Sequence, residues 1–350
     1  MQILSSKEFL MLSQLLPIVD VRSPGEFAEG HIPKAINIPI FNDEERAVVG
    51  IIYKKQGRLP AIEKGLEIVG AKMAQFVKQA IKIAPSGQLC IYCWRGGMRS
   101  ESMAWLFERV DLKCSLLQGG YKSYRNYLLE HVGNIPNLIV IEGSTGSGKT
   151  EILEKLKEIG EQIIDLESFA NHRGSVFGGI GQQPQPTTQQ FQNRIFEEIL
   201  KFDLSKRVWI EGESQTVGRV FLPDPLWACM NTSQNLEVVI PRSERIERLV
   251  REYGSLPAEL MENAIITIVQ RLGDQRMREI LYNYREKNLV IVADLLLEYY
   301  DQTYQYSRDK YKKKLTEILL PDGDPTSNAA LLLQKAEEVF SLHPFQTTEL

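Results

Sequence analysis

Short apolar runs alternate with amphipathic stretches along the first part of the chain, a pattern typical of α/β proteins. Residues 17–21 and 89–92 are apolar runs of strand length. Between them, the apolar residues of segment 73–84 recur at helical spacing, which predicts a helix. A helical pattern resumes at residues 100–109, so residues 93–99 are predicted to form a strand-to-helix loop.

The segment from residue 131 to residue 137 shows no periodicity and contains Gly133 and Pro136. We therefore predict an interdomain linker there and divide the chain into domains of residues 1–134 and 135–350. Further strand-like runs follow the linker, at residues 138–142, 162–166, 207–211 and 236–240. Their succession predicts a mostly parallel sheet.

From Ser243 onward the pattern is mainly helical, and we allow one last strand at residues 289–293. Residues 178–190 are rich in Gln and Pro, so we expect them to form a mobile surface loop. The predicted fold class is α/β: a first α/β domain that carries a cysteine loop, then a phosphate-loop α/β domain with a mainly helical C-terminal part.

The composition excludes some classes of protein but does not identify the function. A chain of 350 residues exceeds the span of one core, and its 43% hydrophobic and 25% charged residues exclude a disordered or fibrous protein. The net charge of -4 does not indicate a polyanionic partner, so a surface that binds nucleic acid would have to be a local patch. Four cysteines in such a length do not make a disulfide framework, and no apolar run spans a bilayer. We expect free thiols and a cytoplasmic location.

The predicted strand-to-helix loop has the composition of an anion cradle. Its residues are Cys93, Trp94, Arg95, Gly96, Gly97, Met98, Arg99 and Ser100. Backbone N–H groups at a helix N-terminus hold anions, and together with Arg95 and Arg99 they favour a reactive thiolate at Cys93. We expect positive φ angles at Gly96 and Gly97. A lone cysteine is more often a buried structural thiol, as we expect for Cys90, but the glycines and arginines favour reactivity here.

Two further segments, residues 20–39 and 117–121, resemble the opening signature and the closing Gly-Gly segment of rhodanese domains. The resemblance implies that Cys93 accepts sulfur or selenium as a persulfide or perselenide. It also implies a structural network of Asp20, Arg22 and Glu26 around the loop. One departure is that Arg99 stands six positions after Cys93, one residue further than in the common sulfurtransferase loop and as in cysteine phosphatases. Phosphatase chemistry therefore stays open.

A second loop fits the phosphate-binding pattern G-x-x-x-x-G-K-S/T without a mismatch, directly after the strand at 138–142. Its residues are Gly143, Ser144, Thr145, Gly146, Ser147, Gly148, Lys149 and Thr150. We expect its N–H groups and Lys149 to bind a phosphate chain, and Thr150 could ligate Mg²⁺, although no metal is specified. The acidic partner is either Asp165 or Glu211, each at the end of a strand.

Other candidates are weaker. His172 and Arg173 lie among glycines where we expect the opening of the phosphate site, which makes them candidates for substrate contact. Two sets of basic residues could contact RNA phosphates, although a solvated, ion-paired helix is the ordinary alternative for the first. These sets are Arg242, Arg245, Arg248 and Arg251, and residues 310–314 with the nearby Tyr299, Tyr300, Tyr304 and Tyr306.

The combination of the two loops, with the stretch 165–175 after the second, resembles the tRNA 2-selenouridine synthases over nearly the whole chain. The resemblance implies a transferase that converts wobble 2-thiouridine in transfer RNAs for Lys, Glu and Gln into 2-selenouridine through an S-geranyl intermediate. It implies geranyl diphosphate and selenophosphate as co-substrates and no tightly bound cofactor. We expect the diphosphate at Lys149 and the selenium at Cys93.

Two other functions stay open at this point. One is a P-loop kinase or ATPase fused to a rhodanese-type cysteine phosphatase or sulfurtransferase. The other is a sulfur-carrier module without a stable RNA complex.

Overall fold

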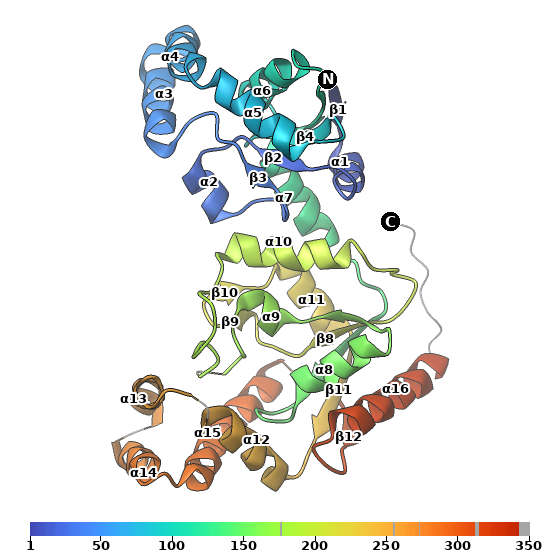
Figure 1. The fold of residues 1–350 in the computed structure, drawn as a ribbon. Coiled ribbons are helices and arrows are strands. Elements are labelled where there is room, and N and C mark those ends of the chain that lie inside the picture. Colours follow the sequence, from blue (N-terminus) through green and yellow to red (C-terminus); the bar gives the residue numbers. More distant parts are fainter. Residues whose placement is uncertain (176, 255, 273, 312–314, 343–350) are drawn as a thin grey trace. The chain divides into compact units, whose positions relative to one another are not determined.

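The computed structural model describes residues 1–175, 177–254, 256–272, 274–311 and 315–342, and the chain divides into two compact units (Figure 1). Unit 1 is Met1–His131 and unit 2 is Val132–Leu350. The predicted division after residue 134 falls just inside the second unit.

Unit 1 is built on a parallel five-stranded sheet in the order β1-β5-β4-β2-β3. The strands are β1 (Gln2–Leu4), β2 (Ile18–Asp20), β3 (Ile36–Asn37), β4 (Gln88–Tyr92) and β5 (Lys113–Leu117). The helices are α1 (Ser6–Leu12), α2 (Pro24–Glu29), α3 (Asp43–Gln56), α4 (Arg58–Gly70), α5 (Met73–Ile83), α6 (Met98–Glu108) and α7 (Gly120–His131). The helix and strands predicted in this region are confirmed.

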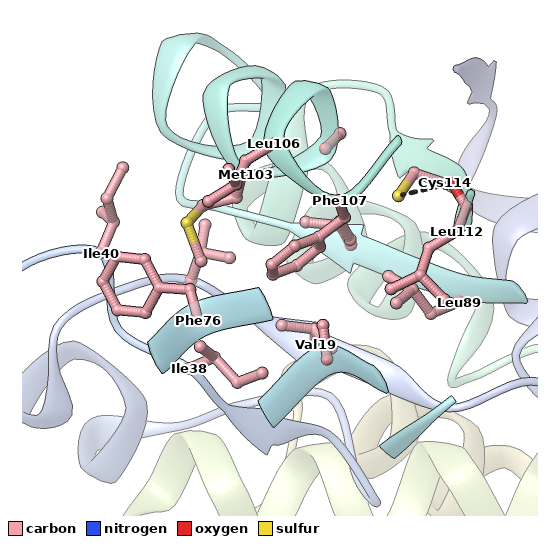
Figure 2. Close-up of a cluster of buried hydrophobic side chains, with 14 of the residues drawn as sticks. Val19, Ile38, Ile40, Phe76, Leu89, Met103, Leu106, Phe107, Leu112 and Cys114 are labelled. Carbon is pink, nitrogen blue, oxygen red and sulfur yellow. Dashed lines mark hydrogen bonds between the residues drawn. The ribbon is translucent and has the colours of Figure 1, made fainter. Parts of the chain in front are cut away.

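The core of unit 1 follows from alternation along the strands. Val19 and Leu89 of the sheet are buried against Phe76 of α5 and Met103 and Phe107 of α6 (Figure 2). Burying side chains of this size supplies about 1.5–3 kcal/mol each, so this layer holds β4 and the loop that follows it in place.

Unit 2 contains a second parallel five-stranded sheet, in the order β12-β11-β6-β8-β7, and a short antiparallel hairpin of β9 and β10. The strands are β6 (Leu138–Glu142), β7 (Gln162–Ile164), β8 (Val208–Glu211), β9 (Thr216–Val217), β10 (Val220–Phe221), β11 (Gln234–Val239) and β12 (Leu315–Leu319). The predicted parallel sheet is therefore confirmed.

The helices of unit 2 fall into two groups. The first group contains α8 (Lys149–Glu158), α9 (Leu166–Ala170), α10 (Thr188–Ile199), α11 (Asp224–Thr232) and α16 (Pro325–Leu342), of which α8 and α16 share a buried cluster with the sheet. The second group, α12 (Arg242–Gly254), α13 (Ala258–Leu272), α14 (Asp274–Arg285) and α15 (Leu289–Tyr311), gathers at one end of the unit around its own apolar cluster (Figure 1).

The strand that we allowed at residues 289–293 is wrong, because this segment opens helix α15. Val292, Leu296 and Tyr300 recur at helical spacing, and their side chains are all buried. The helix thus buries apolar side chains that a short strand would leave exposed. The last strand is β12, which pairs with β11.

The Gln/Pro-rich segment is also partly reassigned. Helix α10 already begins at Thr188, capped by Thr187, and Gln190 is buried. Only the part before residue 187 is loop. Among the described residues no helix has the length and apolarity to cross a membrane, and all four cysteines are unpaired, as expected.

The fold of unit 1 depends on one buried ion pair. Arg22 Nη2 donates to Asp20 Oδ2 at 2.6 Å and to the Gly30 carbonyl at 2.6 Å, and both charged side chains are fully buried. The guanidinium carbon lies 4.0 Å from the centre of the Tyr121 ring. The pair thus ties β2 to the segment after α2 and to α7.

We expect Arg22→Met to destabilise unit 1 by about 3–5 kcal/mol, because it leaves the Asp20 carboxylate buried without its cation. The double variant Asp20→Asn/Arg22→Met should recover part of that loss. Hydrogen exchange of the β2 and β4 peptides in the full-length protein, measured at increasing urea, checks both. Equal losses in the single and double variants would contradict this explanation.

Candidate functional site

The sulfur of Cys93 lies at the N-terminal end of helix α6, which begins at Met98. Cys93 is 3% exposed. Its Sγ accepts the N–H of Gly97 at 3.4 Å and the hydroxyl of Ser100 at 3.2 Å. Two donors and the positive end of a helix thus converge where the chain passes from β4 into α6, which stabilises negative charge on an anion there. The predicted strand-to-helix loop is confirmed and spans residues 93–97.

The loop keeps its shape because glycines allow two segments to touch. Gly96 has φ 60°, and a Cβ there would lie 2.6 Å from the Leu117 carbonyl oxygen. Gly120, with φ 62°, lies directly against the Cys93 carbonyl in the same way. The expectation of positive φ is wrong for Gly97, whose φ is -126° because it leads directly into α6.

Arg99 turns to a carboxylate of unit 1. Its Nη1 donates to Glu26 Oε2 at 2.6 Å, and despite burial, which raises it, the pKa of Glu26 is lowered by the Arg99 hydrogen bond and charge. Of the other loop side chains, Arg95 and Met98 are exposed, while Trp94 tilts against a tyrosine of α7. The carboxylate network implied by the rhodanese resemblance therefore pairs Asp20 with Arg22, and Glu26 with both Arg99 and Arg46.

Cys90 and Cys114 differ from Cys93 in their surroundings. Burial raises the pKa of each of these thiols to about 12, so both are protonated at neutral pH. This agrees with the expectation that Cys90 is a packed residue, and it makes Cys90 a matched control for Cys93.

In unit 2 the phosphate loop connects β6 to α8. Gly146 and Gly148 have φ angles of 78° and 84°, which only glycine adopts without strain. Ser147 N–H donates to the Ser144 carbonyl at 3.1 Å within the turn. Lys149 Nζ donates to the Gly143 carbonyl at 2.8 Å and thereby lies across the loop.

Two arginines of α12 hold the outer side of this loop. Arg245 Nε donates to the Thr145 carbonyl at 2.9 Å, and Arg248 Nη1 donates to the Gly146 carbonyl at 2.9 Å. Arg248 also pairs with Glu151 at 2.8 Å. We call Arg245 and Arg248 the arginine clamp.

The arginine clamp changes the interpretation of the α12 arginines as tRNA contacts. Arg245 and Arg248 are 8% and 6% exposed, so they support the loop from inside the unit. Arg242 pairs with Asp294 and Asp301, and Arg251 has a side chain that is 70% exposed. For these two, RNA contact stays a prediction. The predicted basic segment 310–314 lies largely outside the described residues, and so does the side chain of Tyr306.

Thr150, the last residue of the phosphate loop, is bonded to an acid that the sequence analysis did not single out, while Glu211, one of the two predicted acids, acts on the charge of Lys149. Thr150 Oγ1 donates to Glu167 Oε2 at 3.0 Å. Asp165 instead caps α9 by accepting Ser168 N–H, and the fully buried Glu211 accepts the N–H of Glu167 at 2.5 Å. The sequence signal that we missed is a second acid two positions after each strand-end acid, since Glu213 follows Glu211 as Glu167 follows Asp165.

Burial and mutual repulsion raise the pKa values of these carboxyl groups. Burial and then Glu213 raise the pKa of Glu167 to about 7. Burial, then Glu167 and Asp165, raise the pKa of Glu211 well above its ordinary range. Burial alone would lower the pKa of Lys149, but Tyr304 and Glu213 hold it above its ordinary value. Lys149 therefore stays charged, while the acids around it share protons.

A cavity of about 770 Å³ opens on this loop. Its lining includes Lys149, Thr150, Glu167 and Glu213. Another part of its lining is apolar or aromatic: Phe177, Ile180, Leu249, Leu256, Tyr299 and Tyr300. The cavity can therefore hold an anionic head group and a hydrocarbon tail together.

Arg173 lines this cavity, as predicted, whereas His172 lines a separate hollow. No group of three or more His, Cys, Asp or Glu side chains in the described part of the chain is arranged to hold a metal ion. Mg²⁺ at Thr150 therefore stays a prediction. Glu167 would be the carboxylate nearest at hand for it.

These features define the class of protein: a rhodanese-like domain joined to a P-loop-type α/β domain. The family models agree, since residues 6–127 match the rhodanese-like domain and residues 136–334 match the tRNA 2-selenouridine synthase AAA domain.

The relatives name the family. A tRNA 2-selenouridine synthase of Sulfurovum sp. (strain NBC37-1) is 36% identical over 335 residues, which are 85% of this chain and 90% of that protein. The synthase of Bdellovibrio bacteriovorus is 32% identical over 86% of this chain and 91% of its own. That of Nitrosomonas europaea is 37% identical over 68% and 63%. The chain belongs to the tRNA 2-selenouridine synthase family.

The pKa of Glu167 predicts a pH dependence of anion binding at the phosphate loop. As the pH falls from 8 to 6, Glu167 takes up a proton and stops repelling an anion near Lys149. Titration calorimetry with inorganic pyrophosphate, without metal, measures this effect. At pH 8 the Glu167→Gln variant should bind pyrophosphate roughly tenfold more tightly than the wild type, which corresponds to the free energy of one pKa unit. At pH 6 the two proteins should bind it about equally. The comparison cancels the titration of pyrophosphate itself. A ratio that does not change with pH would contradict the prediction.

Proposed function

We propose that this chain is a tRNA-modifying transferase that converts 2-thiouridine to 2-selenouridine through an S-geranyl intermediate. The observation that carries the proposal is the cavity of unit 2, which joins a phosphate loop to an apolar lining. The apolar part of the lining suits the hydrocarbon chain of a prenyl diphosphate, and the phosphate loop suits its diphosphate. Family membership supports tRNA as the other substrate.

In this proposal, geranyl diphosphate binds with its diphosphate on the loop and its hydrocarbon chain along Phe177, Leu249 and Tyr300. The sulfur of the base attacks C1 of the geranyl group, and the C–O bond breaks with its electron pair going to the diphosphate. Lys149 stabilises the departing charge, which is greatest in the transition state. The apolar lining excludes water, which would otherwise compete with the base for the geranyl group.

The second step replaces the geranylthio group with selenium, and we assign it to Cys93. Selenophosphate is a tetrahedral anion, and the Gly97 N–H and the end of α6 supply donors for it. A geranylthiolate leaves carbon more readily than a bare sulfide, so alkylation has to come first.

The electron balance favours attack of Cys93 on phosphorus over attack on selenium. Attack on selenium would form a perselenide only if phosphorus left with the electron pair, as phosphite. Attack on phosphorus breaks the P–Se bond with the pair on selenium, which leaves as hydrogen selenide and then displaces geranylthiolate from the base. Water hydrolyses the phosphocysteine to orthophosphate, and no oxidant or reductant is needed.

A split phenotype tests the proposal. Cys93→Ala should still produce S-geranyl-2-thiouridine but no selenouridine, because the phosphate loop is intact. Lys149→Ala should lose geranylation by about 10²-fold or more, since it removes a charge at the leaving group. Nucleoside mass spectrometry of 2-thiouridine tRNA, incubated with geranyl diphosphate with and without selenophosphate, measures both products.

Cys90→Ala is the matched control, because it removes a buried thiol from β4, three residues before Cys93, without touching the loop, and it should keep both steps. Geranylation lost in the Cys93 variant and retained in the Lys149 variant would overturn the assignment. Unchanged tRNA with the folded wild-type protein, together with ATP or phosphate-ester turnover, would favour the kinase or phosphatase alternative.

The fate of phosphorus separates the two routes at Cys93. We expect ³¹P NMR to show one orthophosphate formed for each selenouridine and no phosphite. Acid quenching during turnover should trap phosphate on the peptide that contains Cys93. Phosphite as the product would instead support a perselenide.

We further propose the transfer RNAs for Lys, Glu and Gln as the substrates and the cytoplasm as the compartment. The four unpaired cysteines agree with a reducing environment.

A further inference from the structure

Unit 2 contains a second hollow of about 700 Å³ that the proposed chemistry has not used. It shares Gly174 and Ser175 with the phosphate-loop cavity, so the two spaces adjoin. Gly174 has φ 67°, and a Cβ there would lie 2.6 Å from Glu167 Oε1 and 3.0 Å from Glu213 Oε1. The turn between the two spaces therefore rests on the carboxylates of the phosphate site.

Most of the residues that line this hollow are glycines or carry polar side chains. Asn171 Nδ2 donates to the Pro184 carbonyl at 2.9 Å, and Gln185 Nε2 donates to the carbonyls of Ala170 and Val217 at 3.1 and 3.0 Å. These two amides hold the walls. Over the described ranges, the side chains of Gln182, Gln183 and Arg219, which also line the hollow, have no hydrogen-bond or ion-pair partner in the protein.

His172 sits where glycines make room for its ring. A Cβ on Gly178 would lie 2.9 Å from His172 Nδ1, and one on Gly218 would lie 2.7 Å from Cδ2. Nδ1 is buried and, within the described part of the chain, unpartnered, so Nε2 is the nitrogen left for a ligand. Burial and then Arg219, the charged group set against this ring, lower the pKa of His172. The imidazole is therefore neutral at physiological pH and able to accept a proton.

A ring acceptor accompanied by amide and guanidinium donors complements one chemical class well. The imide edge of a uracil-type base presents an N–H between two acceptors, O4 and the atom on C2. An acceptor such as His172 Nε2 suits that N–H, and the free donors of Gln182 and Arg219 suit the flanking atoms. The volume is within the usual range for ligand sites.

We infer that this hollow binds the 2-thiouracil base of tRNA, extruded from its strand, with its sulfur directed to the Gly174–Ser175 junction and its N3–H against His172. The inference rests on the proposed function and adds the acceptor site to it. When sulfur forms its bond to geranyl C1 and diphosphate leaves, the N3 proton passes to His172 Nε2. The alkylated base is then neutral, and charge and atoms balance.

Position-specific crosslinking tests where the base binds without requiring the reaction. An anticodon stem-loop carrying 4-thiouridine at the wobble position is irradiated with the full-length protein, and crosslinked peptides are mapped by mass spectrometry. Crosslinks in residues 171–185 or 216–219 are expected. Crosslinks confined to other segments would overturn the inference, even if the wild-type protein geranylates tRNA.

Kinetics test the role of His172. His172→Phe keeps a ring but removes the acceptor, and it should lower kcat/KM for geranylation of the 2-thiouridine stem-loop by about 10²-fold, with pyrophosphate affinity unchanged within twofold. His172→Gln, which keeps an acceptor, should recover part of the rate. The acidic limb of the wild-type pH profile, expected below pH 6.5, should be absent from both variants.

The outcomes separate this inference from the proposed function. Wild-type rates in His172→Phe, or an equal loss of pyrophosphate affinity, would overturn the base site while leaving the transferase in place. A wild-type protein that geranylates no RNA would overturn the proposed function, and the crosslink map would then still decide whether the hollow binds the base.

Discussion

The phosphate loop depends on the arginine clamp. A loop that turns its N–H groups toward an anion turns carbonyls outward, and buried carbonyls without donors are costly. Arg245 and Arg248 supply those donors from α12, about a hundred residues later in the chain. The fit is close, since a Cβ on Gly148 would lie 2.8 Å from the Arg248 guanidinium. The apolar helical group at one end of unit 2 is therefore coupled to the phosphate site, and the apolar part of the cavity is a consequence of that packing.

Charge balance is the second constraint on the site. Lys149 interacts with the charges of Glu167 and Glu213, and its Nζ donates to the Gly143 carbonyl. Protonation of the carboxyls lowers the repulsion among them, but it also leaves the lysine without a full counter-ion. A bound diphosphate supplies that counter-ion. The charge of Lys149 thus favours an anion in this site, which agrees with the diphosphate of the proposed function.

Sequence patterns predicted those parts of the molecule that are formed by residues close together in the chain. Strand Leu138–Glu142 and the phosphate loop after it are formed by consecutive residues, and so is the Cys93 loop. Contacts between residues far apart in the chain could not be predicted from the sequence. Arg245 and Arg248 therefore resembled a surface stripe, and Arg99 resembled an anion ligand rather than the partner of Glu26. Glu167 was missed because Asp165 occupies the strand end, and only the capping of α9 shows that Asp165 serves the helix. Residues 289–293 were misassigned because a β-branched run looks the same at the start of a buried helix.

The recessed positions of Cys93 and Lys149 constrain the RNA in the proposed function. Cys93 is 3% exposed, and Lys149 lies within a cavity, so neither group can reach a base stacked inside a helix. A base must be unpaired and splayed out before its C2 substituent can approach either group, and unpaired loops offer such bases at the lowest cost. In the proposed function the two steps use residues of different units, Lys149 in unit 2 and Cys93 in unit 1. In that proposal the geranyl group has a second use besides its role as a leaving group, because its hydrocarbon chain gives the first step a product that differs from its substrate.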